Sequence, residues 1–120
     1  MTWVPYATLW GFVIRSSRRS AGVQQRRLAI ALGIGQSGLA KIEKGIVAPT
    51  VLQVAIVADT LAPGRPGRHW ELNKRVERLR RRCTEHGLEV RLCKLPVREE
   101  MRAGCVYGAR LEEILWGLAE

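Results

Sequence analysis

The segment QQRRLAIALGIGQSGLAKIEKG, residues 24–45, constrains the fold more than any other part of the chain. It holds two short stretches with apolar residues at helical spacing, Leu28 and Leu32 in the first and Leu39 and Ile42 in the second. The two stretches are joined by Gly-Ile-Gly, and a glycine directly after a helix favours a left-handed cap. Two short helices joined by such a tight turn are typical of a helix-turn-helix.

The flanking segments predict a further helix on each side of this pair. Residues 8–20 form the first predicted helix, and Leu9 and Val13 begin its inner stripe. Residues 50–61 form the fourth, and Thr50, placed directly after a proline, is its expected N-cap. The first half of the chain therefore reads as four helices.

The second half begins with a linker and then changes pattern. Residues 62–68, APGRPGR, hold two prolines and two glycines. A strongly basic helix over 69–87 follows, and the alternation at 88–95 predicts a strand. Residues 104–108 are expected to form a short return strand, and 109–120 a closing amphipathic helix.

These segments predict a mainly α protein with two units. Residues 1–61 would form a helix-turn-helix domain, followed by the linker at 62–68. Residues 69–120 would form a small α+β unit, ordered helix, β-hairpin, helix, which dimerises or binds a partner.

Composition narrows the class of partner. The net charge is +9 and the estimated pI is about 10.5, which favours a partner that carries phosphate. The three scattered cysteines include no Cys-x-x-Cys pair, so we expect reduced thiols in a cytoplasmic protein. With only two histidines, we expect no metal site and no cofactor. The longest uncharged runs, 1–14 and 45–58, are too short to span a bilayer, and no membrane partner is expected.

The polar residues of the predicted third helix suit contact with base edges. In a helix-turn-helix the second helix of the pair enters the major groove of DNA with its first turn against the bases. The amide of Gln36 can donate to adenine N7 and accept from adenine N6, and Lys41 can donate to guanine. Gly38 has no side chain, so the backbone there can approach DNA closely.

Residues 14–61 resemble the Cro/repressor-type helix-turn-helix, also called the Xre family. The matching residues keep the family spacing without a gap: Gly22, Gln25, Leu28, Ala29, Gly33, Gln36, Ile42, Glu43, Lys44, Gly45, Pro49, Ala58 and Leu61. The resemblance implies a lambda-repressor-like fold that binds double-stranded DNA, usually as a homodimer on an inverted-repeat operator.

The resemblance also implies a role for individual side chains. The base-reading positions are Gln36, Ser37 and Lys41. The positions expected to contact phosphate are Gln24, Gln25, Lys44 and Arg19. Arg18 and Glu43 occupy the positions of a partly buried ion pair between the first and third helices.

Surplus apolar residues in the predicted fourth helix indicate a contact surface. Val51, Val54, Ala58 and Leu61 are expected to face inward. Leu52 and Ile56 then remain, four residues apart on one face, as a dimer or interdomain contact. We expect a dimer built mainly by residues 68–120 with this helix contributing, because a hairpin at 88–107 would offer an edge for strand pairing.

The function predicted from these features is sequence-specific transcriptional regulation, by a dimeric repressor of phage, plasmid or mobile-element type. One alternative is an antitoxin that regulates its own operon and binds a toxin through residues 68–120. A second is the non-catalytic remnant of a peptidase-linked sensor. We expect no enzymatic activity, because no serine follows Ser37 and no His-Glu-x-x-His motif is present. Whether the basic helix, rich in arginine over 74–82, contacts DNA or only solvent is left open.

Overall fold

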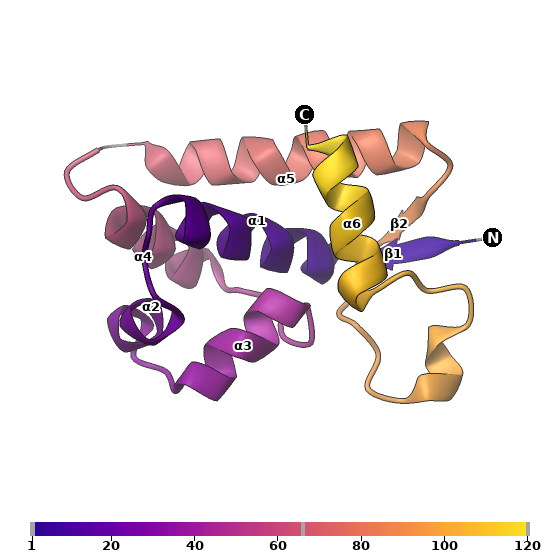
Figure 1. The fold of residues 1–120 in the computed structure, drawn as a ribbon, viewed down its shortest axis with the longest axis horizontal. Coiled ribbons are helices and arrows are strands. Elements are labelled where there is room, and N and C mark those ends of the chain that lie inside the picture. Colours follow the sequence, from indigo (N-terminus) through magenta and orange to yellow (C-terminus); the bar gives the residue numbers. More distant parts are fainter. Residues whose placement is uncertain (1, 66, 120) are drawn as a thin grey trace.

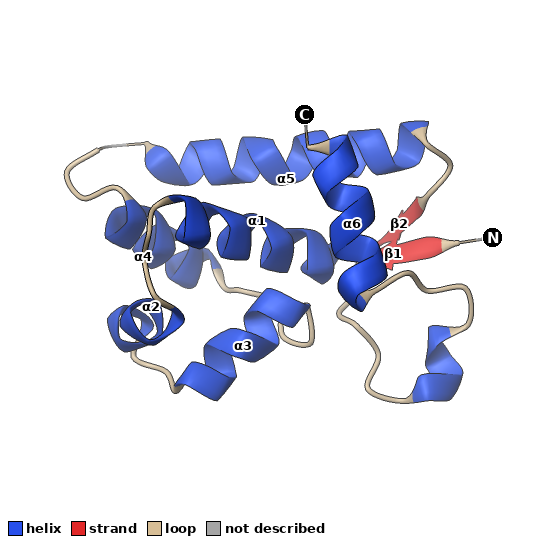
Figure 2. Cartoon of the chain, in the orientation of Figure 1, coloured by secondary structure: helices blue, strands red, loops and turns tan. Residues whose placement is uncertain are grey.

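The computed structural model describes residues 2–65 and 67–119, which form a mainly helical protein with one small sheet (Figures 1 and 2). The elements in chain order are β1 (Trp3–Pro5), α1 (Tyr6–Ser20), α2 (Gln25–Leu32), α3 (Gln36–Lys44), α4 (Val51–Leu61), α5 (Arg68–Glu85), β2 (Glu89–Arg91), the 3₁₀ helix η1 (Glu99–Arg102) and α6 (Gly108–Leu118). The mainly α class and all six predicted α-helices are confirmed.

The caps expected at Gly33 and Thr50 are confirmed, whereas α1 begins at Tyr6 and not at residue 8, and α5 ends at Glu85 and not at residue 87. Gly33 ends α2 with φ +69°, and Gly45 ends α3 with φ +82°, both in the left-handed region that glycine favours. Thr50 caps α4 by accepting from the backbone N–H of Gln53, whose side chain accepts in return from the backbone N–H of Thr50.

The helices pack in layers around α1. Helix α5 runs along one side of α1, and α2 and α3 lie on the opposite side (Figure 1). Helix α6 crosses α1 near its N-terminal half, where Phe12 and Trp116 make an edge-to-face contact with ring centroids 5.2 Å apart. The helix-turn-helix pair and the basic helix therefore occupy different faces of the molecule.

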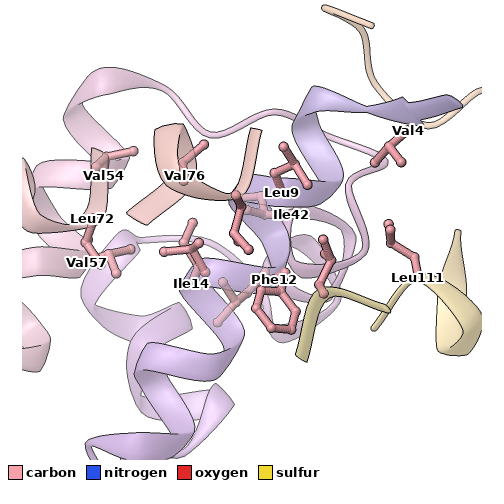
Figure 3. Packing of buried hydrophobic residues seen from close by; sticks show 14 of the residues in the cluster. Val4, Leu9, Phe12, Ile14, Ile42, Val54, Val57, Leu72, Val76 and Leu111 are labelled. Carbon is pink, nitrogen blue, oxygen red and sulfur yellow. The ribbon is translucent and has the colours of Figure 1, made fainter. Parts of the chain in front are cut away.

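A single hydrophobic cluster joins the residues on the two sides of the linker. Ile14, Ile42 and Val57 from the first half meet Leu72 and Val76 of α5 in this cluster (Figure 3). The two segments are thus continuous in their packing, although the linker separates them along the chain.

The predicted β-hairpin is wrong. β2 pairs instead with β1, in parallel, with Val4 opposite Val90. The expected return strand at 104–108 is reduced, within the described residues, to one isolated bridge between Cys105 and Trp3. Strand β1 therefore contacts both β2 and the segment that contains Cys105. Trp3 and Val4 are buried, at 3% and 0% exposure, and this burial holds the backbone of β1 beside β2.

One inward position of α4 also differs from the prediction. Val51 is 89% exposed, and Val57 is buried in its place together with Val54 and Ala58. Val51 is the first residue of α4, and its side chain is left largely to solvent at the start of the helix.

Candidate nucleic-acid interface

Helix α3 is amphipathic, with one apolar face buried in the core and one polar face exposed to solvent, as in a recognition helix. Leu39 and Ile42 are buried at 0% and 3% exposure and anchor the helix to the core. The opposite face is exposed to solvent and carries the predicted contact residues Gln36, Ser37, Lys41 and Lys44. The short helix is thus held by two apolar anchors, which leaves its polar side chains free for a ligand.

A chain of hydrogen bonds connects the exposed end of α3 to the core. Gln36 Nε2 donates to Gln25 Oε1 at 3.1 Å, and Gln25 Nε2 donates to Glu43 Oε1 at 3.0 Å. Glu43 in turn accepts from Arg18. The amide of Gln36 is therefore oriented by its neighbours before any partner arrives, which lowers the entropy lost on binding.

The ion pair at the base of this chain is present and nearly buried. Arg18 Nε lies 2.8 Å from Glu43 Oε2, and Arg18 Nη2 lies 3.2 Å from Glu43 Oε1, so the pair is bidentate. The two side chains are 9% and 4% exposed. Arg18 Nη1 also donates to the carbonyl of Val23 at 3.0 Å, which ties the loop before α2 to α1.

A glycine in α1 sets the distance between α1 and α3. A Cβ placed on Gly11 would lie 2.4 Å from the carbonyl oxygen of Glu43 and 2.7 Å from that of Ile42. The two backbones approach closely here, and only a residue without a side chain fits. Sequence reasoning missed this role, although a glycine inside an apolar helical segment is a signal of close packing.

The N-terminal ends of α2 and α3 both present positive potential. Among the described residues, no side chain caps either end and no acidic residue lies in either first turn. The free backbone N–H groups of such ends attract phosphate. Gln24 is exposed at the N-cap of α2, and Arg26 and Arg27 are exposed in its first turn.

The remaining predicted phosphate contacts lie in different environments. Lys44 is exposed at the last turn of α3. Arg19, at the end of α1, is 55% exposed at its side chain and lies 4.0 Å from the carboxylate of Glu112 in α6. Arg19 is therefore shared with an acidic group of the C-terminal unit, whereas Lys44 has no carboxylate partner among the described residues.

The basic face of α5 is directed away from α3. Leu72, Val76, Leu79 and Cys83 are buried and face the core, whereas Lys74, Arg78 and Arg81 are exposed on the outer side. Since α1 lies between α5 and α3, these three cations are on the side of the molecule opposite the recognition helix (Figure 1).

Of the two residues predicted for a dimer or interdomain contact, only one is fully outward. Leu52 is 70% exposed, and Ile56 is half-buried. The chain's own C-terminal unit does not cover Leu52, so an apolar surface remains on α4 beside Val51.

Of the three cysteines, Cys83 is buried, Cys105 is half-buried and Cys93 is exposed. Burial raises the pKa of Cys83 from 9.0 to about 11, and burial also raises the pKa values of Cys93 and Cys105. A raised pKa leaves little thiolate at neutral pH, which makes a thiol a poor nucleophile and metal ligand. Over residues 2–65 and 67–119, no group of three His, Cys, Asp or Glu side chains is placed to hold a metal ion.

The comparison with protein-family models agrees with this geometry. Residues 14–62 match a family model described as helix-turn-helix, of the Xre/Cro type, and the predicted resemblance over 14–61 is confirmed. No curated protein and no solved structure matches the chain. Within the described part of the chain, no helix is long and apolar enough to cross a membrane.

Proposed function

Because residues 14–62 form a helix-turn-helix domain of the Cro/repressor type, which binds DNA in transcription regulation, we propose that this chain is a repressor that binds an inverted-repeat operator as a homodimer. The observation that carries the proposal is the chain of hydrogen bonds from Gln36 through Gln25 to Glu43 and Arg18. It presents one oriented amide at the exposed N-terminal turn of α3, where a recognition helix meets base edges.

In this proposal some side chains contact the bases and others contact the phosphates. Gln36, Ser37 and Lys41 read base edges in the major groove. Backbone N–H groups at the two helix ends, with Gln24 and Lys44, bind phosphates and fix the register of the helix on the duplex. Binding blocks access of RNA polymerase to the promoter in the cytoplasm, and no chemical step is involved.

Selection of bound DNA from a random pool tests the proposal. We expect an inverted repeat whose half-sites are about 34–36 Å apart, one helical turn. With the selected site, Gln36→Ala should lose discrimination at one base step by about 1–3 kcal/mol, while Lys44→Ala should weaken binding to all sequences alike. A pool that yields no common sequence, or equal losses on specific and random DNA for both variants, contradicts the assignment.

The observed strand pairing changes which surface is expected to form the dimer. With β1 paired to β2, an edge from a 88–107 hairpin no longer supports a C-terminal dimer. The exposed apolar surface of α4, formed by Val51 and Leu52, now supports the contact best. We therefore assign the homodimer to α4, in contact with α4 of a second copy.

Light scattering on the full chain tests this assignment. Leu52→Lys should shift the protein toward monomer at micromolar concentration, because a charge replaces an apolar contact. Leu92→Lys is the matched control, since Leu92 is 84% exposed in the C-terminal unit. If Leu92→Lys dissociates the dimer and Leu52→Lys does not, the C-terminal unit forms the interface instead.

A toxin or other protein partner is a second candidate, favoured by the apolar side chains that the C-terminal unit exposes. Leu92, Val97 and Met101 are 84%, 82% and 62% exposed. An antitoxin would cover them with its partner. A small protein that copurifies with the wild type and is lost in Val97→Lys would favour this reading over the simple repressor.

A further inference from the structure

We propose that the pocket between α3 and the C-terminal unit binds a small amphipathic organic anion, and that this ligand weakens DNA binding by engaging Lys44. The coupling to DNA rests on the proposed function, whereas the binding site itself does not. The pocket has a volume of about 490 Å³, within the range of roughly 300–1,000 Å³ that is usual for small-molecule sites.

The walls of the pocket suit an apolar body. Phe12 of α1, Leu111 and Leu115 of α6, and Ile46 and Leu95 of the connecting loops line it. These residues come from both halves of the chain, so the pocket exists only because α6 and the loop before η1 pack against the helix-turn-helix domain. A ligand with an aromatic or aliphatic body would bury apolar surface here.

The charges that line the pocket leave an excess of cations. Glu43 is engaged by Arg18, and Glu112 is engaged by Arg15 at 2.9 Å. In contrast, Lys44 and Arg102 have no carboxylate partner among the described residues. An anionic group on the ligand would therefore find two cations whose charge is not already neutralised within the protein.

Arg102 is positioned for this role by contacts that do not neutralise its charge. Its Nε donates to the carbonyl of Pro96 at 2.6 Å, and its guanidinium stacks over the ring of Tyr107, with 4.7 Å to the ring centroid. The remaining guanidinium N–H groups are available to a carboxylate or sulfonate. Tyr107 also lines the pocket, next to the start of α6.

The pocket is connected to the recognition helix by its last turn. Glu43, Lys44 and Ile46 line it, and the carbonyl of Gly45 accepts a hydrogen bond from the backbone N–H of Leu95 at 2.8 Å. A ligand that holds the ammonium of Lys44 withdraws a cation from the DNA phosphates. Because linkage is reciprocal, DNA must weaken ligand binding by the same factor.

The first test uses anilinonaphthalene sulfonate, an aromatic anion that fluoresces when bound, with the full-length protein. The variant Arg102→Gln should weaken dye binding about tenfold or more, because one charge-assisted hydrogen bond is lost. Ala109→Trp, at an exposed residue on the pocket wall, should block the dye without disturbing the core. Arg98→Gln, at the N-cap of η1 and outside the pocket lining, is the matched control and should leave dye binding unchanged.

Competitors define the ligand chemistry. Displacement of the dye by naphthoate but not decanoate assigns an aryl acid, and the reverse assigns a fatty acid. Displacement by naphthol as strong as that by naphthoate means that the charge is not recognised and overturns the proposal. Equal dye binding by wild type, Arg102→Gln and Ala109→Trp places the dye on another apolar surface and also overturns it.

The second test measures coupling to DNA with a mixed-sequence duplex at low salt. Saturating competitor should weaken duplex binding by the wild type roughly fivefold or more, and Lys44→Ala should lose this effect. Unchanged duplex affinity with the competitor bound overturns the coupling. A protein that binds the dye as expected but binds no duplex contradicts the proposed function alone, so the two failures are distinguishable.

Discussion

Replacing Arg18 with alanine is expected to destabilise the protein far more than replacing its neighbour Arg19. In the wild type, Glu43 accepts from Arg18 at 2.8 and 3.2 Å, and its side chain is only 4% exposed. In Arg18→Ala the carboxylate keeps one bond, from Gln25 at 3.0 Å, and loses its counter-ion. Breaking a buried pair in this way costs about 3–5 kcal/mol.

The free energy converts to a measurable melting shift. For a chain of 120 residues, a loss of 1 kcal/mol lowers Tm by about 4 °C, so Arg18→Ala should lower it by about 12–20 °C. Arg19 is 55% exposed and 4.0 Å from its nearest carboxylate, and such surface pairs contribute about 0–1 kcal/mol, or at most about 4 °C.

Thermal unfolding followed by circular dichroism is the assay, with both single variants and the double variant Arg18→Met/Glu43→Met. The double variant removes the stranded charge as well as its partner, so it should recover much of the loss seen in Arg18→Ala. Equal melting temperatures for Arg18→Ala and Arg19→Ala, or a double variant less stable than Arg18→Ala, would refute the reasoning.

Three further outcomes are expected. Lys44→Ala should reduce the slope of log K against log salt concentration by about 0.9, whereas Lys74→Ala should not change it, because α5 faces away from α3; equal changes would contradict that arrangement. Gly11→Ala should cost about 1–3 kcal/mol or more of unfolding free energy, since a Cβ there meets backbone oxygen at 2.4 Å. Gly117→Ala, also in a helix but facing open space, should gain up to about 1 kcal/mol, and chemical denaturation compares the two. Burial raises the pKa of Cys83 from 9.0 to about 11, so the folded protein retains a proton that the unfolded chain releases. The stabilisation that this retained proton gives the folded state is fully present below pH 9. It is lost as the pH rises from 9 through 11, by about 3 kcal/mol at 1.36 kcal/mol per pH unit. Denaturation of Cys83→Ala over the same range should lack this component, and parallel curves would contradict it.

Local sequence patterns were sufficient to predict the six α-helices and the caps at Gly33 and Thr50. The spacing of Leu39 and Ile42 predicts the buried side of α3, and Gly35 and Gly45 are its N-cap and C-cap. These features depend on residues within one or two helical turns, so they can be read from a short window. The face of α3 that carries Gln36 and Lys41 follows from the same periodicity.

The strand pairing, the role of Gly11 and the pocket depend on residues that are far apart in the chain, so only the tertiary structure shows them. The strand at 88–95 was expected to pair with its neighbour in sequence, but the buried Trp3 and Val4 occupy that edge, and parallel pairing between such distant segments leaves no local pattern. The same holds for Gly11, whose need for close approach depends on the backbone of α3, and for the pocket lined by Phe12 and Arg102. Periodicity shows which side of a helix is buried, but only packing shows which element covers it, because hydrophobic burial has no direction of its own.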